Sequence, residues 1–342
     1  MELKGKTALL TGGCGLIGSH IADLLVRDEQ IERVVILDNL SRGALHNIEW
    51  AQRHGDVKLV RKDIRHFEDI RPHFDGVDIV FHLAAIRITA CANRPRECLE
   101  VMVDGAYNVV EASVQAGVKR FVASSTASVY GAADSYPTSE GHHPYNNRTW
   151  YGAAKLANEG LYRAFNDMFG LPYIALRYFN VYGPRMDVFG KYTEVLIRWL
   201  EFLDRGEDPK LFGDGRTSMD FVYVEDVARA NILAAKSEIV DDVFNIASGA
   251  ETSLLELLQT LLKVTGQTKA QPEFLAERNV NPVPRRLADV TKAETKLGFR
   301  AQVGLEEGLR RLVEWRSQVM AGSHHADYAG EKKASVATEV GA

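Results

Sequence analysis

A glycine-rich segment near the start of the chain, Thr11–Gly18 with the sequence TGGCGLIG, constrains the fold more than any other feature. It follows a short apolar run, Thr7–Thr11, and leads into an amphipathic run, Leu16–Arg27. Glycines at such a junction let a strand turn sharply into a helix and let the backbone approach a bound phosphate. Asp38 stands twenty residues after Gly18, at the end of the next apolar run, where a carboxylate accepts hydrogen bonds from ribose hydroxyls. The segment therefore predicts a strand–turn–helix unit that binds a dinucleotide, in preference to a purely structural glycine turn.

The residues around Asp38 favour NAD over NADP as that dinucleotide. The 2′-phosphate of NADP would meet the like charge of the Asp38 carboxylate. Ser41 and Arg42 lie close by in the sequence and are able to bind a phosphate, so NADP remains the alternative. Asp63 follows the third apolar run and is expected at the adenine edge, with a plain surface turn as the other interpretation.

Short apolar runs alternate with helical patterns through the first half of the chain, which predicts an α/β fold with a Rossmann-type doubly wound parallel sheet. Beyond about residue 180 the pattern is less regular, and we expect a smaller C-terminal α/β substrate-binding lobe there. The predicted division is 1–180 for the NAD-binding domain, with some later segments returning to it, 181–321 for the lobe and 322–342 for a disordered tail. The predicted strands are Thr7–Thr11, Arg33–Leu37, Val57–Val60, Asp78–Phe81, Arg120–Ser124 and Pro172–Arg177, and the predicted helices are Leu16–Arg27, Arg94–Ala116, Tyr151–Phe169, Tyr192–Arg205, Val224–Ala235, Ser253–Thr265 and Leu305–Arg316.

Composition excludes several classes of protein. The 342 residues carry a net charge of -5 at pH 7, which provides no broad basic field for nucleic acid but is compatible with a local positive pocket for a phosphate-bearing ligand. No apolar run is long enough to cross a bilayer and no secretory segment opens the chain, so we expect no membrane and a cytoplasmic location. The three cysteines, Cys14, Cys91 and Cys98, form no Cys-x-x-Cys pair and indicate neither a zinc site nor a disulfide framework. His142 and His143 have no carboxylate at metal spacing, so no metal is predicted.

Tyr151 and Lys155 are four residues apart in a predicted helix, and this spacing places a phenol and an ammonium on the same face one turn apart. The positive charge there favours the phenolate over the phenol, which makes Tyr151 a candidate general base. A hydroxyl-rich run, Ser124–Gly131, ends the predicted fifth strand, and the carboxyl ends of strands in such a sheet face the ligand crevice. Thr126 is expected to hydrogen-bond a substrate oxygen there. The alternative, that these hydroxyls only end a strand and cap a turn, is disfavoured by the pair that follows.

With these motifs on the page, the chain resembles the extended short-chain dehydrogenase/reductase superfamily, and within it the NAD-dependent nucleotide-sugar epimerase/dehydratase family. The resemblance runs from Lys6 to about Trp315. Besides the glycine turn, the hydroxyl-rich run and the Tyr-Lys pair, it rests on three further motifs, which are His82–Ala85, Arg177–Arg185 and Asp220–Asp226.

The resemblance implies roles for individual residues. It implies that Tyr151 and Lys155 are catalytic with Thr126 assisting, that NAD is the cofactor, and that the substrate is a nucleotide-diphosphate sugar, with a UDP-sugar first. It implies that cofactor-binding residues are Gly12, Gly15, Leu16, Ile17, Gly18, Asp38, Asn39, Ser41, Arg42, Asp63, Ile64, Leu83, Ala84, Ala85, Ser124, Tyr151, Lys155, Tyr178 and Val181. The substrate-binding candidates are Arg87, Thr126, Asn180, Arg185, Arg216 and Arg278.

Two positions after Thr126 favour one reaction within the family. Relatives that dehydrate a sugar carry an Asp-Glu pair directly after the catalytic threonine, because eliminating water needs a second acid and base, whereas this chain has Ala127 and Ser128. The Glu of uronate decarboxylases is also missing from this run, which is similar to that of the UDP-galactose 4-epimerases. We therefore expect epimerisation at C4 through a 4-keto intermediate. The alternatives are a sugar-nucleotide dehydrogenase or reductase with net redox, and an NAD-binding regulatory module without turnover.

Several residues depart from the pattern that the resemblance implies. Many relatives have a diphosphate-binding arginine where this chain has Met219, so phosphate recognition must differ, with Arg278 a better candidate than Arg216. Val101–Met102 occupies a position where relatives often have an asparagine that contacts the cofactor. The helices Arg94–Ala116 and Tyr151–Phe169 correspond to the pair that forms a four-helix interface in the family's dimers, and a homodimer is predicted on that basis.

Overall fold

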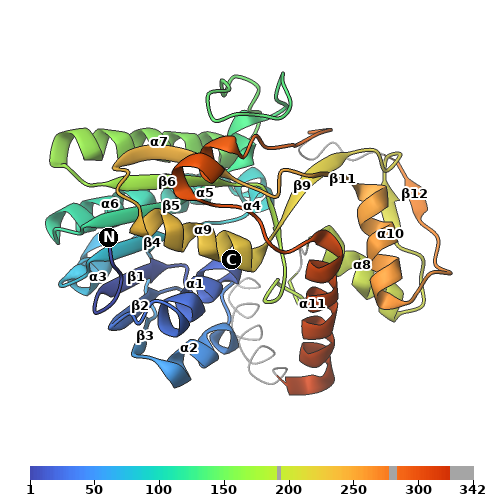
Figure 1. The fold of residues 1–342 in the computed structure, drawn as a ribbon, viewed down its shortest axis with the longest axis horizontal. Coiled ribbons are helices and arrows are strands. Elements are labelled where there is room, and N and C mark those ends of the chain that lie inside the picture. Colours follow the sequence, from blue (N-terminus) through green and yellow to red (C-terminus); the bar gives the residue numbers. More distant parts are fainter. Residues whose placement is uncertain (191–193, 277–282, 324–342) are drawn as a thin grey trace.

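The computed structural model describes residues 1–190, 194–276 and 283–323, and its larger body is built on a seven-stranded parallel sheet (Figure 1). The predicted fold class, an α/β fold with a Rossmann-type doubly wound sheet, is confirmed. From one edge to the other the strands are β3 (Val57–Val60), β2 (Arg33–Leu37), β1 (Thr7–Thr11), β4 (Ile79–His82), β5 (Arg120–Thr126), β6 (Tyr173–Tyr178) and β10 (Asp241–Ile246).

Helices cover both faces of this sheet. Helices α1 (Leu16–Arg27) and α9 (Val224–Lys236) pack together on one face, and α3 (Phe67–Ile70), α6 (Gly105–Gln115) and α7 (Trp150–Phe169) cover the other. Alternate residues of each strand enter the two cores, which is why the central strands read as continuous apolar runs.

The strand order reverses between β1 and β4, and this reversal positions the functional site. From β1 the chain builds β2 and β3 to one side and then crosses back to place β4 on the other side of β1. Because the connecting helices lead away in opposite directions here, a crevice opens at the carboxyl ends of the strands, where doubly wound proteins bind ligands. The glycine turn and the hydroxyl-rich end of β5 both lie at this edge.

A smaller lobe stands beside the sheet, on the right in Figure 1. It contains one three-stranded sheet, β11 (Glu251–Ser253), β9 (Ser218–Tyr223) and β7 (Asn180–Tyr182), and the pair β8 (Lys210–Phe212) and β12 (Glu273–Leu275). Helices α8 (Val195–Asp204), α10 (Leu254–Thr265) and α11 (Leu305–Gln318) enclose its core around the buried Trp199. The remaining helices and helical turns are η1 (Leu45–Ile48), α2 (Glu49–His54), η2 (Arg71–Phe74), α4 (Ile88–Asn93), α5 (Pro95–Leu99), η3 (Glu100–Asp104), η4 (Ala127–Tyr130), η5 (Ala293–Leu297) and η6 (Val319–Ser323).

The structure corrects parts of the predicted order of elements. The predicted helix Arg94–Ala116 is divided into α5, the π-helical turn η3 and α6. Strand β10 was not predicted as a strand, because it opens with two aspartates and its parallel partner β6 lies far away in the sequence. The domain limits stay a prediction, since β10 and α9 follow residue 180 and still belong to the larger body, while the proposed tail from 324 onward lies outside the described residues.

The cysteine prediction was wrong in one respect. Cys91 and Cys98 form a disulfide that links α4 to α5. An odd number of cysteines excluded only the pairing of all three, and the absence of a Cys-x-x-Cys pair says nothing about a seven-residue separation across a helix break. Among the helices of the described ranges, none combines the length and the apolar content needed to span a bilayer.

Replacing Gly18 with alanine tests the packing of the glycine turn. A Cβ atom on Gly18 would lie 2.6 Å from the Gly12 carbonyl oxygen and 2.7 Å from the Gly13 Cα, and these backbone atoms cannot move aside. We expect Gly18→Ala to lower the free energy of unfolding by about 1–3 kcal/mol in urea titrations. The matched control is Gly160→Ala in α7, where a Cβ meets nothing within 4 Å and alanine should stabilise the helix by up to ~1 kcal/mol. Equal effects of the two substitutions would contradict the packing argument.

Candidate active site

One cavity of about 1310 Å³ opens where the carboxyl ends of the strands meet the smaller lobe. It is larger than the ~300–1,000 Å³ typical of a site for a single small ligand. Its lining joins the glycine turn, Tyr151 and Lys155 from the larger body to Asn180 and Arg286 from the segments that follow. Basic side chains outnumber acidic ones in this lining, although the whole chain is acidic. The arrangement offers room for two ligands and a local field that favours phosphates.

The glycine turn supplies one end of the cavity. Gly12 has a φ of 69°, and a Cβ there would lie 2.8 Å from the backbone nitrogen of Ala84, so only glycine allows the turn to approach the end of β4. Helix α1 begins after Gly15 with no side-chain cap and no acidic residue in its first turn. Its first N–H groups and the positive end of its dipole are therefore suited to a pyrophosphate.

Asp38 is fixed beside this turn. One carboxylate oxygen accepts a hydrogen bond from the Cys14 backbone N–H (2.9 Å) and the other from that of Leu40 (2.8 Å). Burial raises the pKa of Asp38, and these two bonds oppose that rise. The side chain is 7% exposed and faces the cavity, where an acceptor for ribose hydroxyls is needed.

Asp63 is engaged with neighbours that the sequence did not indicate. Burial alone would raise its pKa, but hydrogen bonds from Arg65 and from the Asn39 side chain hold the pKa at about 2. Asp63, Arg65 and Asn39 all line the cavity, and the Asp63 carboxylate is held in an ion pair with Arg65, while its contact with adenine stays a prediction. The donors, acceptors and glycine backbone of this half of the cavity fit a dinucleotide.

Tyr151 and Lys155 lie in the first turns of α7. Thr149 caps this helix by accepting a hydrogen bond from the Gly152 N–H (3.1 Å). The Lys155 Nζ donates to the Ser124 carbonyl oxygen (2.6 Å) and to the Ser124 Oγ (2.9 Å). Burial lowers the pKa of Lys155 to about 8, with Glu159 opposing that shift.

The electrostatic surroundings of Tyr151 differ from the expectation. Burial raises the pKa of its phenol, while the charge of Arg42, a hydrogen bond with Thr126 and the charge of Arg286 lower it. We predicted that Lys155 would be the cation that favours the phenolate. In this structure its ammonium is directed to the end of β5 instead, and Arg42 and Arg286 are the cations that act on the phenol.

Thr126 caps a turn, as one interpretation of its position suggested, and it also contacts Tyr151. It is not among the residues that line the cavity, so its bond to a substrate oxygen stays a prediction. Its Oγ1 accepts a hydrogen bond from the Ser128 N–H (3.1 Å), which caps the turn η4. The same side chain hydrogen-bonds the Tyr151 phenol. The capping interpretation and the active-site interpretation therefore do not exclude each other.

The substrate-binding candidates divide into three groups. Asn180, at the start of β7, lines the cavity, and its buried Oδ1 has no hydrogen-bond partner within the described ranges, which suits it to a donor on a ligand. Arg87 and Arg185 also line the cavity, and each is paired with a carboxylate, Glu194 (2.8 Å) and Asp23 (2.6 Å) respectively.

Arg216 and Arg278 form the last group. The Arg216 side chain is 88% exposed, pairs with Asp214 at 2.6 Å and does not line the cavity, so the structure corrects its prediction as a substrate ligand. Arg278 lies outside the described residues.

The predicted cofactor residues line the cavity with one exception, Val181. Val181 packs instead between the core of the larger body and that of the smaller lobe. Among the residues that do line the cavity, Tyr178 donates a hydrogen bond to the Asn231 Oδ1 (2.9 Å).

The sequence analysis missed Arg286 as a functional residue. It lines the cavity, and its charge acts on Tyr151. Two adjacent arginines in the run PVPRRLAD were a signal, but nothing in the sequence distinguishes the one that turns inward.

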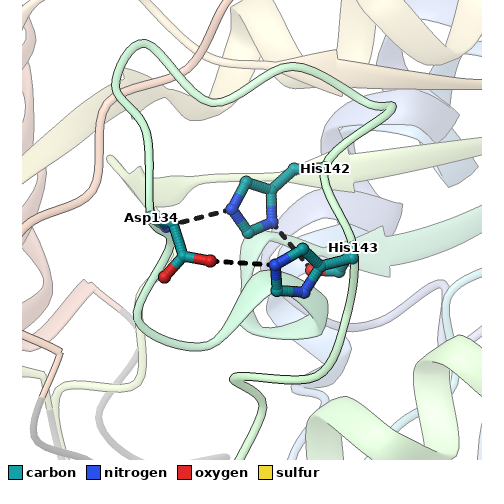
Figure 2. A group of neighbouring side chains, drawn as sticks. All are labelled: Asp134, His142 and His143. Carbon is teal, nitrogen blue, oxygen red and sulfur yellow. Dashed lines mark hydrogen bonds and ion pairs between the residues drawn. The ribbon is translucent and has the colours of Figure 1, made fainter.

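A second group of polar side chains lies in the loop before α7 (Figure 2). Here Asp134 approaches both His142 and His143, and their ligand atoms lie within 4.8 Å of one another. The prediction that no carboxylate accompanies the histidines is therefore wrong, because Asp134 is eight residues away in sequence. His143 Nε2 bonds the Asp134 carboxylate (2.8 Å), while His142 Nε2 accepts from the Asp134 N–H (3.0 Å) and its Nδ1 bonds the His143 carbonyl (2.7 Å). Both ring nitrogens of His142 are thus used to hold the loop together.

Comparison with known proteins gives a consistent result. Residues 8–247 match the model of the NAD dependent epimerase/dehydratase family. A UDP-glucose 4-epimerase of Mycolicibacterium smegmatis is 35% identical over 311 residues, which cover 90% of this chain and 97% of that protein. A UDP-N-acetyl-alpha-D-glucosaminuronate decarboxylase of Bacillus cytotoxicus is 31% identical over 324 residues, covering 92% and 98%. The crystal structure of Thermotoga maritima UDP-glucose 4-epimerase with UDP-glucose superposes with a TM-score of 0.85 at 35% identity, covering 92% and 99% of the two chains.

The titration of Lys155 tests the description of the site. Because burial disfavours the ammonium, its proton should leave at about pH 8 instead of the ~10.4 usual for lysine. The side chain is then charged below pH 8 and neutral above it. NMR of the lysine Cε and Nζ nuclei measures this value, with Lys155→Met to assign the resonance. A midpoint near 10 would contradict the buried environment.

Proposed function

The chain belongs to the NAD dependent epimerase/dehydratase family, and from this premise we propose that it is a nucleotide-sugar 4-epimerase acting on a UDP-sugar. The observation that carries the proposal is the position of Tyr151, which shares one cavity with the glycine turn while no acid-base pair follows Thr126. NAD is the cofactor, and when bound it supplies the acceptor and donor of hydride at its nicotinamide.

Tyr151 is proposed as the group that moves the proton. Its phenol oxygen takes the proton of the C4 hydroxyl while the C4 hydrogen leaves as hydride, and a 4-keto sugar results. The 4-keto sugar then turns over in the cavity, and the proton and the hydride return, the hydride to the opposite face of C4, so that the configuration is inverted with no net redox. Thr126 orients the phenol through its hydrogen bond. Lys155 fixes α7 to the end of β5, which holds Tyr151 over the cavity.

The residues after Thr126 support epimerisation over dehydration. Ala127 and Ser128 form the turn η4 and are both buried, and neither is an acid that would protonate a leaving hydroxyl. The turn is packed among apolar side chains that include Val129 and Phe179. Elimination of water therefore lacks its second catalytic group in this segment.

We further propose that two copies associate through α6 and α7. Tyr107, Met168 and Phe169 are large apolar side chains of these helices, and each is exposed. Tyr107 packs edge-on against Phe165, which also contacts Phe169, so Tyr107 and Phe169 belong to one aromatic surface, and Met168 directly precedes Phe169 in α7. Helices α6 and α7 lie at the opposite end of the molecule from α8 and α10 (Figure 1), so this association leaves the smaller lobe clear.

Replacing Tyr151 with phenylalanine tests the proposed base. The change removes one hydroxyl and should lower kcat by about 10²–10⁴-fold, while NAD stays bound. Tyr145→Phe is the matched control, because Tyr145 is 86% exposed and should leave kcat unchanged. The assay follows sugar isomers and free NADH with UDP-glucose, UDP-glucuronate, their N-acetyl analogues and dTDP sugars. Steady release of NADH, or an undiminished rate in Tyr151→Phe, would contradict the proposal.

The association of two copies has its own test. Sedimentation equilibrium at ~10 μM should give twice the 38.0 kDa mass of one chain. The double substitution Tyr107→Glu with Met168→Glu places charges in the aromatic surface and should give monomers. A monomeric wild-type protein, or a double variant that still pairs, would exclude this interface.

A further inference from the structure

We propose that Arg286 is the receptor for a carboxylate on the sugar, so that the preferred substrate is a nucleotide-diphosphate hexuronate. The inference rests on the proposed C4 chemistry and adds the class of sugar. It starts from a charged side chain in the cavity wall for which residues 1–190, 194–276 and 283–323 provide no paired carboxylate.

Arg286 is a partly buried cation, and its solvent-inaccessible nitrogens have no partner in the part of the chain that the structure describes. Its Nε and Nη2 atoms are inaccessible to solvent and have no hydrogen-bond partner among the described residues, and no carboxylate in those ranges pairs with it. Burial lowers the pKa of its guanidinium to about 10, and the groups that act on it in the opposite direction are the phenols of Tyr136 and Tyr151. A guanidinium presents N–H donors in a fixed fork that matches a carboxylate or a phosphate. Leaving such donors desolvated is costly, so the arrangement is suited to an anionic ligand.

Three other arginines that line the cavity differ from Arg286 because each has a carboxylate partner. Arg65, Arg87 and Arg185 each pair with a carboxylate of the chain. The adjacent Arg285 makes a bidentate pair with Glu251 (2.7 Å for each bond) and stacks over the Tyr136 ring. Successive side chains of an extended segment alternate in direction, so one arginine is neutralised outside the cavity while its neighbour faces inward.

The backbone holds Arg286 in place. Its N–H donates to the Ser218 carbonyl (2.9 Å) at the start of β9, and Arg285 forms a parallel bridge with the same residue. Two residues further on, Ala288 bridges to Thr138, which belongs to the loop before α7. The backbone of the segment is therefore fixed on both sides, which sets the point from which the Arg286 side chain reaches the cavity wall.

The position next to Tyr151 indicates which anion Arg286 would bind. Tyr151 reacts at C4 in the proposed function, and its phenol feels the charge of Arg286. In a pyranose ring C4 lies opposite C1, which carries the diphosphate, so a cation near Tyr151 faces the substituents that flank C4. In a hexuronate one of these is the C6 carboxylate, attached to C5. A neutral hexose offers only a hydroxymethyl group, which leaves the buried charge unpaired, and a site with unpaired polar groups discriminates strongly against such a ligand.

The first experiment compares UDP-glucuronate with UDP-glucose in wild type, Arg286→Gln and Arg285→Gln. Wild type should have the larger kcat/KM with UDP-glucuronate. In Arg286→Gln the ratio of kcat/KM for the uronate to that for the hexose should fall at least ~30-fold, mainly through KM. Arg285→Gln keeps the inward guanidinium and should keep the wild-type ratio. An unchanged ratio in Arg286→Gln, or a wild-type preference for UDP-glucose, would overturn the inference.

Two further arms exclude other anions. If Arg286 bound the diphosphate, in the role of the arginine that Met219 replaces, Arg286→Gln would weaken inhibition by UDP as much as it weakens the binding of UDP-glucuronate. We expect instead that the inhibition constant of UDP changes less than about 2-fold. UDP-N-acetylmuramate carries its carboxylate on the other flank of C4, at O3. Dependence on Arg286 for that ligand and not for UDP-glucuronate would overturn the assignment to a hexuronate.

Binding to a catalytically inactive variant separates this inference from the proposed function. In the Tyr151→Phe background, calorimetry should show tighter binding of UDP-glucuronate than of UDP-glucose, and adding Arg286→Gln should remove the difference. This readout needs no turnover, so it can fail while epimerisation stands, or succeed while epimerisation fails. If Arg286→Gln does not fold, Arg286→Lys keeps the charge without the fork and should lower the uronate preference by a smaller factor.

Discussion

The fixing of helix α7 to the end of strand β5 is the constraint on which the site depends. A buried ammonium, Lys155, donates to both the carbonyl and the hydroxyl of Ser124, and removing either partner would leave buried polar atoms unsatisfied. These bonds set the rotation of α7, and that rotation turns Tyr151 toward the cavity and toward Thr126. The lysine thus acts first as a structural tie, and the electrostatic control of the phenol comes from arginines on other segments.

The cavity is shared between two bodies with different tasks. The doubly wound sheet supplies backbone N–H groups, a fixed carboxylate at Asp38 and the reactive phenol, which together suit a dinucleotide and a proton transfer. The smaller lobe and the segment around Arg286 contribute polar atoms that have no partner among the described residues, such as the Asn180 Oδ1, and the larger body adds the Asn47 Oδ1 and the Arg87 Nε. Both bodies therefore leave polar atoms in the cavity wall for ligands to satisfy.

Features that depend on local pattern were predictable from the sequence. The bounds of β1, β2, β3 and α1 coincide with the prediction, because glycine positions and apolar periodicity decide them within a few residues. The residues expected around the cofactor came from the family resemblance instead, and all of them except Val181 line the cavity. Strand β10 could not be found this way, since a polar start conceals a strand whose partner is distant.

The packing of turns and loops accounts for the other differences. The Cys91–Cys98 disulfide, the approach of Asp134 to the histidines and the inward direction of Arg286 all depend on how loops pack, and spacing along the chain carries no such information. Arg216 is an error in the other direction. Its place in the sequence, shortly before Met219, suggested a substrate ligand, but the folded loop directs its side chain to solvent.

The fate of the C4 hydrogen tests the central claim most directly. A UDP-sugar substrate labelled with deuterium at C4 is incubated with the enzyme in ordinary water, and both epimers are analysed by NMR and mass spectrometry. If hydride leaves C4 and returns to the same carbon, the product epimer keeps its deuterium at C4 in full. Loss of the label to water, its appearance at C6 or its accumulation in free NADH would contradict the account.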